Sequence, residues 1–295
     1  LSGDRIIEIE GKNTRGITLQ DAVGKLRGKV GTAVNFTIAR TQGGEVKEIK
    51  ISVERANIEV KSVRDFAGRS SYGLMDEQIG YVRLASFGDK TSSEMEKAMQ
   101  RMEKAGLKGL VIDLRDNPGG LLDQSVKVAE KFLPKDQLVV STEGRGKEDV
   151  DKHHASGRVK VRKYPVVVLV NGGSASASEI VAGCLQDLKR AELVGEKTFG
   201  KGSVQSILPL RNGAALRLTT AKYYTPSHRV IHEKGITPDH EVKLAPEVLR
   251  DLILKRSPGG LESLPAEDRE RVKKAKDTQL EKAMELLKAK ITAAK

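Results

Sequence analysis

Large aromatic side chains are scarce in this chain of 295 residues: tryptophan is absent, and aromatic residues make up only 3%. Cysteine occurs once, at Cys184, so no disulfide can form within the chain. Because Cys184 lies in an apolar, helix-like segment, we expect it to pack in the core, and it gives no indication of redox compartment. The longest apolar run, 166–170, is far too short to cross a bilayer.

The charge balance is basic, with 52 Lys and Arg residues against 40 Asp and Glu residues, a formal net charge of +12. Nucleic-acid-binding proteins share this excess, but they gather their basic residues on one face. Here basic and acidic residues are interspersed and aromatics are few, so we expect no nucleic-acid partner. A surface that attracts acidic partners or anionic lipid headgroups is the open alternative.

The chain opens at Leu1 in what reads as the middle of a domain. We therefore expect the natural amino terminus, and with it any targeting segment, to be missing from this sequence. The length predicts about two domains.

Residues 1–56 have the pattern of a β-rich unit. A short strand near 6–9 precedes a helix over 18–26, whose first residues, Thr18 to Asp21, predict a capping box. Strands follow over 33–40 and 48–53, joined by a hairpin turn at Gly43-Gly44.

This first unit resembles the second half of a PDZ domain, although a generic β-hairpin domain is the alternative. A PDZ domain binds a chain end by adding it as a strand beside its own edge strand. The family's first strand and carboxylate-binding loop are absent here, so we do not expect this part to bind peptide alone. The motifs that carry the resemblance are Ser2-Gly3-Asp4-Arg5-Ile6-Ile7, Ile9-Glu10-Gly11, and Leu26-Arg27-Gly28 with Gly31-Thr32.

Residues 57–245 alternate between strand and helix patterns. Apolar runs that are uninterrupted on both faces, alternating with helices, indicate an α/β domain. The charged segment 143–163 is expected to be a solvated hairpin or a flexible insertion. Strands are expected over 79–87, 110–114, 166–170, 191–194, 204–210 and 215–223, and helices over 92–105, 121–132 and 177–188.

Residues 246–295 predict a helical tail rich in Lys and Glu. Its last part spaces Leu280, Met284, Leu287 and Ile291 as a narrow apolar stripe. Such a stripe either packs on its own domain or forms a dimer contact, and the two alternatives are close to equal. We take the tail as an oligomerisation segment, which predicts a homo-oligomer.

A serine-rich junction follows the buried strand 166–170. Asn171-Gly172-Gly173 lets the backbone turn sharply, and Ser176-Ala177-Ser178-Glu179 fits a capping box that makes Ser176 a helix N-cap. Taken alone, Ser176 could simply cap a helix. The same position also places its hydroxyl beside free backbone N–H groups and the positive end of the helix dipole. The N–H of Ala177 could then face an oxyanion formed when Ser176 attacks a carbonyl.

Two further segments complete this candidate centre. Asn117-Pro118-Gly119-Gly120 follows the strand at 110–114, and its glycines could supply a second oxyanion donor, although alone it is an ordinary turn. Lys201 stands between two glycines, with Gln205 near enough in sequence to orient an amine. A serine hydroxyl needs a base to take its proton, and a desolvated lysine can serve. The alternative is a surface lysine, so the hypothesis requires Lys201 to be buried.

The chain resembles the carboxy-terminal processing proteases, also called tail-specific proteases. With the PDZ half, the likeness covers about residues 1–245 in the family's order, and four separated motifs in order are far more specific than any one. These motifs are Gly109 to Gly120, Ser174 to Ile180, Val194 to Gln205, and Leu218 to Pro226 followed by Gly235-Ile236-Thr237-Pro238-Asp239.

The resemblance implies a crotonase- or ClpP-like α/β protease core with a partial PDZ domain. By position, Ser176 would be the nucleophile, Lys201 the general base and Gln205 the residue that orients the lysine. Ala177 and a glycine of the pair Gly119 and Gly120 would form the oxyanion hole. No metal or cofactor is implied.

The resemblance also implies partners and a location. Substrates would be proteins or peptides with exposed C-termini, with the PDZ domain controlling activity, and an activator or adaptor protein could be required. Relatives work in the bacterial periplasm, at the outer face of the cell membrane or in the chloroplast lumen, which implies an extracytoplasmic site here. His228 stands where the family usually has a small residue, and with His232 and His240 it is expected to be a surface or supporting group.

Two other function classes are weighed against a serine endopeptidase. A ligand-binding protein with the same fold and no turnover would have no need of a buried lysine. An acyl-CoA enzyme of crotonase type would need a nucleotide site and acid–base carboxylates, and neither is located. Labelling of Ser176 by a reactive-serine probe separates the peptidase from both.

Overall fold

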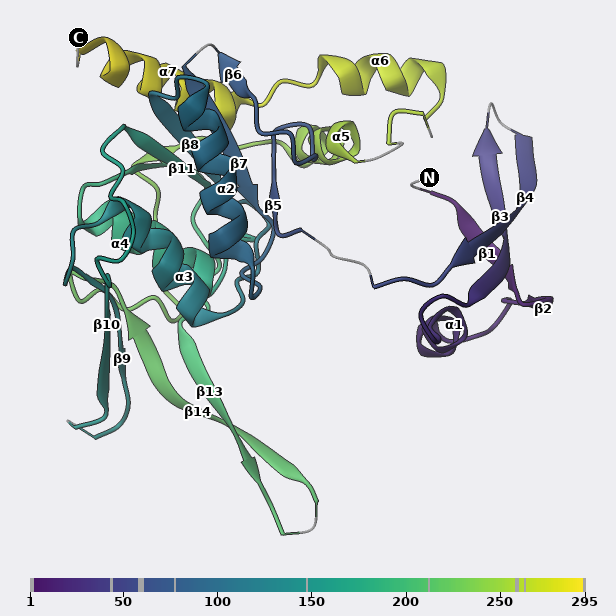
Figure 1. Ribbon diagram of the computed structural model, residues 1–295, viewed down its shortest axis with the longest axis horizontal. Helices are drawn as coiled ribbons and strands as arrows, with labels where there is room; N and C mark the ends of the chain where they lie inside the picture. The colour runs from purple at the N-terminus through teal and green to yellow at the C-terminus, as the bar shows by residue number, and fades with distance from the viewer. Residues whose placement is uncertain are drawn as a thin grey trace. The chain divides into compact units, whose positions relative to one another are not determined.

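The structure is a computed structural model that describes residues 3–42, 45–57, 61–76, 78–146, 148–211, 213–257, 260–262 and 264–293. The chain divides into two units, one of residues 1–60 with 245–276 and one of residues 61–244 with 277–295 (Figure 1). The sequence predicted a single tail from 246 onward. The structure instead divides that tail, and its last part belongs to the second unit.

The first unit contains a four-stranded sheet in the order β2-β1-β3-β4. Thr18 caps α1 by accepting a hydrogen bond from the N–H of Asp21 at 3.1 Å, as the capping-box pattern predicts. The expected turn at Gly43-Gly44 lies outside the described residues. The elements are β1 (Arg5–Ile9), β2 (Lys12–Asn13), α1 (Leu19–Leu26), β3 (Ala33–Gln42) and β4 (Glu45–Glu54), and later α5 (Pro246–Arg256) and α6 (Ala266–Lys274).

The second unit is built on a seven-stranded sheet in the order β15-β12-β11-β8-β7-β5, with β6 also paired to β7. The central strands β7, β8, β11 and β12 run parallel, as buried apolar runs separated by helices predict. The strands are β5 (Val63–Arg64), β6 (Leu74–Asp76), β7 (Ile79–Leu84), β8 (Gly109–Asp113), β11 (Val166–Val170), β12 (Glu192–Gly195) and β15 (His240–Glu241).

Helices cover both faces of this sheet. On one face, the buried side chains of the strands pack with α2 (Thr91–Lys104), α3 (Leu122–Ala129), the short helix η1 (Glu130–Phe132) and α4 (Ala177–Asp187). On the other face they pack with α7 (Thr278–Ala293).

The apolar stripe of α7 is used inside this unit. Leu280 and Leu287 are buried against the sheet, and Met284 and Ile291 pack against the same cluster. Of the two alternatives for the stripe, the structure shows packing on its own domain. The expectation that this stripe forms a dimer contact is therefore wrong, because the sheet already covers it.

A second, antiparallel sheet has the order β10-β9-β14-β13. A hairpin overlaps the charged segment 143–163 only in part, because its strands β9 (Leu138–Glu143) and β10 (Val150–His154) begin and end earlier than expected. β14 (Ala215–Tyr224) pairs with β9 only through its last three residues, so most of its hairpin with β13 (Ser203–Pro209) projects as a two-stranded ribbon (Figure 1).

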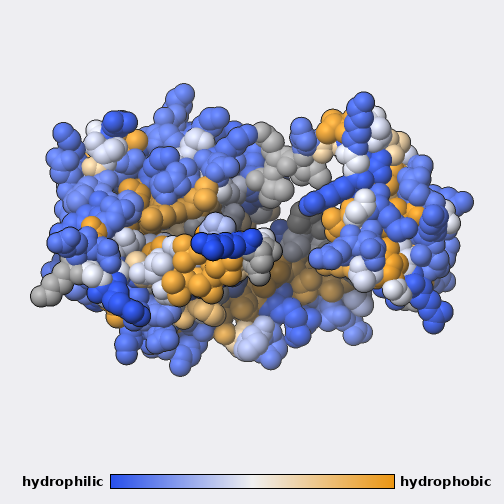
Figure 2. All heavy atoms as spheres, turned by 90° about the horizontal axis from the view of Figure 1, so that it is seen from below, coloured by the Kyte–Doolittle hydropathy of each residue, from blue (hydrophilic) through white to orange (hydrophobic). Residues whose placement is uncertain are grey.

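The ribbon carries exposed apolar side chains, namely Ile207, Leu208, Leu216 and Leu218. Figure 2 views the molecule from the end toward which the ribbon projects in Figure 1 and shows apolar surface between hydrophilic side chains. No helix within the described ranges combines the length and the apolar character that a bilayer crossing requires.

Candidate active site

Three loops that follow neighbouring parallel strands form the candidate site. Residues 116–120 follow β8, residues 171–176 follow β11, and residues 198–201 follow β12. The carboxyl ends of parallel strands lie at one edge of a sheet, which is where open α/β folds bind ligands. The sheet therefore brings together three of the motifs that the sequence singled out.

Ser176 occupies an unusual backbone conformation at the start of α4. It is the N-cap of this helix, as predicted, but its φ of 56° and ψ of −116° lie in a region that side chains other than glycine rarely adopt. Most N-cap residues are extended instead. Such backbone strain costs about 1–3 kcal/mol and is concentrated at functional sites.

The loop after β8 packs directly against this serine. The carbonyl oxygen of Asn117 accepts hydrogen bonds from the N–H of Ala175 at 3.0 Å and from the hydroxyl of Ser178 at 2.9 Å. Gly119 has a φ of 99°, and a Cβ there would lie 2.7 Å from the Cβ of Ser176. Only glycine allows this approach.

The hydrogen bonds of this loop distinguish Gly119 from Gly120 as an oxyanion donor. The N–H of Gly119 donates to the side-chain oxygen of Asn117 at 2.9 Å and is therefore occupied. The N–H groups of Gly120 and Ala177 have no hydrogen-bond partner among the described residues. A Cβ on Gly119 would lie 3.0 Å from the nitrogen of Ala177, so the loop borders the start of α4. Gly120 and Ala177 thus remain as candidate oxyanion donors.

Lys201 and Gln205 do not complete a closed catalytic centre in this structure. Both residues are exposed, and among the described residues no hydrogen bond joins the Lys201 amine to Ser176 or to Gln205. The expectation that Lys201 is buried is therefore wrong for this conformation. Gln205 lies in β13 opposite Thr219, next to a β-bulge, on the ribbon that projects into solvent.

Glu179 connects the serine to the lysine segment. Its side chain is fully buried, and one of its oxygens, Oε2, accepts hydrogen bonds from the N–H of Ser176 at 2.9 Å and from the N–H of Lys201 at 2.8 Å. The sequence identified Glu179 only as the second half of a capping box. Its contact with Lys201, 22 residues away, leaves no periodic signal in the sequence.

Two of the three histidines of this region have hydrogen-bond partners of their own, whereas the buried Nδ1 of His232 has none among the described residues. The ring of His228 meets Glu143 at 2.7 Å and stacks on Tyr224, and the ring of His240 meets Glu192 at 2.5 Å. Among the described residues none of them, His232 included, is hydrogen-bonded to Ser176.

A buried ion-pair network lies directly before the loop after β8. The Arg115 guanidinium contacts both carboxylate oxygens of Asp277, each at 2.9 Å, and also Asp113 and Gln279. Burial opposes the charge of Arg115, yet the carboxylates of Asp113 and Asp277 raise the pKa of Arg115 above its ordinary value. This network fixes the base of the loop to the segment that begins α7.

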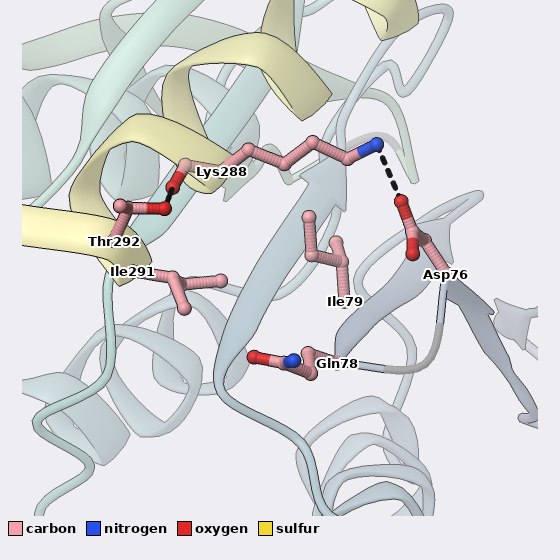
Figure 3. A pocket seen from close by; sticks show the side chains of 6 residues that line it. All are labelled: Asp76, Gln78, Ile79, Lys288, Ile291 and Thr292. Atoms are coloured by element: carbon pink, nitrogen blue, oxygen red, sulfur yellow. Dashed lines mark hydrogen bonds and ion pairs between the residues drawn. The ribbon is translucent and has the colours of Figure 1, made fainter. Parts of the chain in front are cut away.

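A separate pocket of about 210 Å³ lies beside α7 (Figure 3). Lys288 spans one side of it to reach Asp76, and Ile79, the first residue of β7, lines it. It therefore lies at the amino ends of the strands, away from Ser176. Within the described ranges, no group of three or more His, Cys, Asp or Glu side chains is arranged to hold a metal ion.

Comparison with known proteins identifies the family. Residues 78–242, more than half of the chain, match the model of peptidase family S41. The chain belongs to this family. A carboxy-terminal-processing protease from Bartonella bacilliformis is 42% identical over 316 aligned positions, which cover all of this chain and 69% of that protein. The carboxy-terminal processing protease CtpA of Bacillus subtilis is 38% identical over 82% of this chain and 49% of its own length.

A solved structure gives the same assignment. The photosystem II D1 C-terminal processing protease aligns with a TM-score of 0.55 and 29% identity, over 89% of this chain and 69% of its own. The predicted resemblance to carboxy-terminal processing proteases and the mixed α/β protease fold are thus confirmed. The chain spans between about half and about two thirds of the length of the relatives named here.

Proposed function

We propose that this protein is a serine endopeptidase that cleaves protein substrates near their C-termini. Ser176 is the nucleophile and Lys201 is the general base, which Gln205 orients when the centre closes. The observation that carries the proposal is the conformation of Ser176, held at a φ of 56° at the start of α4, beside backbone N–H groups that have no partner in the described part of the chain. A residue that only caps a helix is normally extended and does not need such a strained conformation.

In the proposed reaction, the neutral amine of Lys201 takes the proton of the Ser176 hydroxyl as its oxygen attacks the scissile carbonyl carbon. The N–H groups of Ala177 and Gly120 hold the resulting oxyanion. The carbon–nitrogen bond then breaks, and the Lys201 ammonium protonates the departing amine. A water molecule, deprotonated by Lys201, hydrolyses the acyl-enzyme and restores the hydroxyl.

The exposed position of Lys201 makes this structure a resting form in the proposal. Catalytic hydrogen bonds are often long or absent before substrate binds. In the proposal, the Lys201 side chain moves to close the centre, and its backbone already shares a carboxylate oxygen of Glu179 with Ser176.

The residues before the core supply regulation in this proposal. The sheet β2-β1-β3-β4 with α1 is taken as the second half of a PDZ domain, and the core as crotonase- or ClpP-like. In the full-length protein, a substrate's C-terminus, or an activator or adaptor protein, would bind the complete PDZ domain and favour the closed centre. By resemblance to the family, we also propose an extracytoplasmic location, which cell fractionation of the source organism would check.

The test is cleavage of an unstructured protein with an apolar C-terminus by the full-length protein and by the variants Ser176→Ala and Lys201→Ala. We expect both variants to fold and to lose cleavage, and a fluorophosphonate probe to label the unaltered protein at Ser176 only. Retained cleavage in Lys201→Ala would move the base elsewhere. Absence of both labelling and cleavage, with candidate activators present, would favour a binding protein.

A further inference from the structure

The carboxylate of Glu179 accepts hydrogen bonds from four donors at once. Oε2 accepts from the N–H groups of Ser176 and Lys201 at 2.9 and 2.8 Å. Oε1 accepts from the hydroxyl of Thr198 at 2.5 Å and from the N–H of Gly200 at 2.7 Å. The side chain is fully buried, and all four donors are uncharged groups. An ionised carboxylate offers about four acceptor sites, so this arrangement uses its full capacity.

These donors belong to the two segments that must meet for catalysis. Ser176 begins α4, whereas the other three donors lie in the loop after β12. Because Ser176 and Lys201 share one oxygen, their nitrogens can lie no farther apart than the two hydrogen-bond lengths combined. One further backbone bond, from the N–H of Phe199 to the carbonyl of Ser174 at 3.0 Å, supports the same junction.

We propose that Glu179 is the positioning residue of the reaction, which sets the placement of the Lys201 backbone relative to Ser176. The inference rests on the proposed function and adds to it the group that brings nucleophile and base within reach. The Lys201 side chain is long and exposed, so its amine reaches Ser176 productively only if its backbone is held in place. Glu179 also holds the Ser176 N–H and so retains the strained conformation of the nucleophile.

The variant that tests this role is Glu179→Gln. It keeps the shape of the side chain but replaces one oxygen with an amide nitrogen, which faces two N–H or O–H donors whichever way it is oriented. Glu130→Gln is the matched control. Glu130 is also a buried glutamate that accepts from a backbone N–H and a hydroxyl, both of Ser156 at 2.8 and 2.6 Å, but in the helical layer away from the candidate site.

The measurements are kcat, KM and the pH profile of Ser176 labelling by a fluorophosphonate, all on the full-length protein and scaled to the folded fraction. We expect kcat of Glu179→Gln to fall about 100-fold with KM unchanged, the size of a lost general-base contribution. We also expect the rate of Ser176 labelling in this variant to rise steadily with pH. The plateau that an internal base produces in the unaltered protein should be lost. If Glu179 had only a structural role, the substitution would change the labelling rate by the same factor at every pH and leave the shape of the profile unchanged. Glu130→Gln should keep both kcat and the profile.

A second variant keeps the test decisive if Glu179→Gln does not fold. Glu179→Asp retains two oxygens but is one methylene shorter, so it cannot hold both segments in their present positions. It should lower kcat about tenfold at unchanged KM. Wild-type kcat and pH profile in either folded variant would overturn the inference. If Lys201→Ala remains active, the proposed dyad fails; if the dyad variants are inactive but the Glu179 variants are normal, only the positioning role fails.

Discussion

Gly119 and Ser176 approach each other so closely that no side chain fits between them: a Cβ on Gly119 would lie 2.7 Å from that of Ser176. The contact joins the loop after β8 to the start of α4. It makes the shape of that loop part of the environment of Ser176, because any atom added to Gly119 has to displace the serine.

We therefore expect Gly119→Ala to lower kcat at least 100-fold, the typical cost of losing an oxyanion donor or of displacing the nucleophile. Steady-state peptidase assays measure it. Gly106→Ala is the matched control, because Gly106 has a similar φ of 94° but nothing lies within 4 Å of its added Cβ. That control should lose stability from backbone strain and keep its kcat. Equal kcat in the two variants would contradict the contact's importance.

The strained backbone of Ser176 predicts that glycine is more stable than alanine at this position. Ser176→Gly should be about 1 kcal/mol more stable than Ser176→Ala, since glycine adopts this conformation without strain, and both variants should be inactive. Urea unfolding of the two variants measures the difference. At Ser93, an exposed position inside α2, the same pair should show the opposite order, because glycine is the poorer helix former. An alanine variant that is the more stable at both positions would show that Ser176 carries no strain.

The ion pair between Arg115 and Asp277 predicts a large loss of stability. Asp277→Asn removes a carboxylate from a buried guanidinium and should lower the free energy of unfolding by about 3 kcal/mol. Chemical denaturation at pH 7 provides the measurement. For comparison, Lys127→Met removes an exposed pair with Asp123 and should change stability by less than about 0.5 kcal/mol. Similar losses in the free energy of unfolding for the two variants would mean that the ion pair of Arg115 with Asp277 is not shielded from water.

Glu96 predicts how acid affects stability. Burial raises the pKa of Glu96, but hydrogen bonds from Arg162 and Lys131 outweigh burial and lower the pKa from an ordinary 4.5 to about 2. Its stabilising contribution is therefore complete above pH 4.5 and is lost as the pH falls toward 2.

Glu96→Gln should accordingly be less stable than the unaltered protein by about 2 kcal/mol at pH 7, allowing for partial solvent screening. The difference should shrink between pH 4.5 and pH 2, as followed by urea unfolding across that range. Glu285→Gln, at an exposed pair with Lys282, should have little effect at either pH. A Glu96 difference that does not change with pH would contradict the assignment.

The sequence predicted the regular elements well, and for a physical reason. Strand 166–170 and helix 177–188 follow from uninterrupted apolar runs and from the capping pattern at Ser176, and the structure places β11 and α4 there. Local patterns of this kind also located each segment that surrounds the serine.

Local sequence patterns of this kind did not predict the contacts between distant parts of the chain. The bonds from Glu179 to the lysine segment and from Arg115 to Asp277 depend on how the sheet brings loops together. The exposure of Lys201 was missed because a motif specifies residue types and leaves the conformation open. The stripe on α7 has the same spacing whether it faces a sheet or a second molecule, so spacing alone could not decide between them.

Arg115 depends on a carboxylate that comes 162 residues later in the chain. On the ribosome, the strand before Arg115 is synthesised long before Asp277 is translated, so until then only the neighbouring Asp113 offsets the cost of burying this guanidinium. Pulse proteolysis of ribosome-bound chains halted before and after residue 277 would show the core becoming protected only in the longer ones. Until residue 277 has been made, the segments that carry Gly119, Ser176 and Lys201 therefore lack one of the buried contacts that fix the loop after β8 to the rest of its unit.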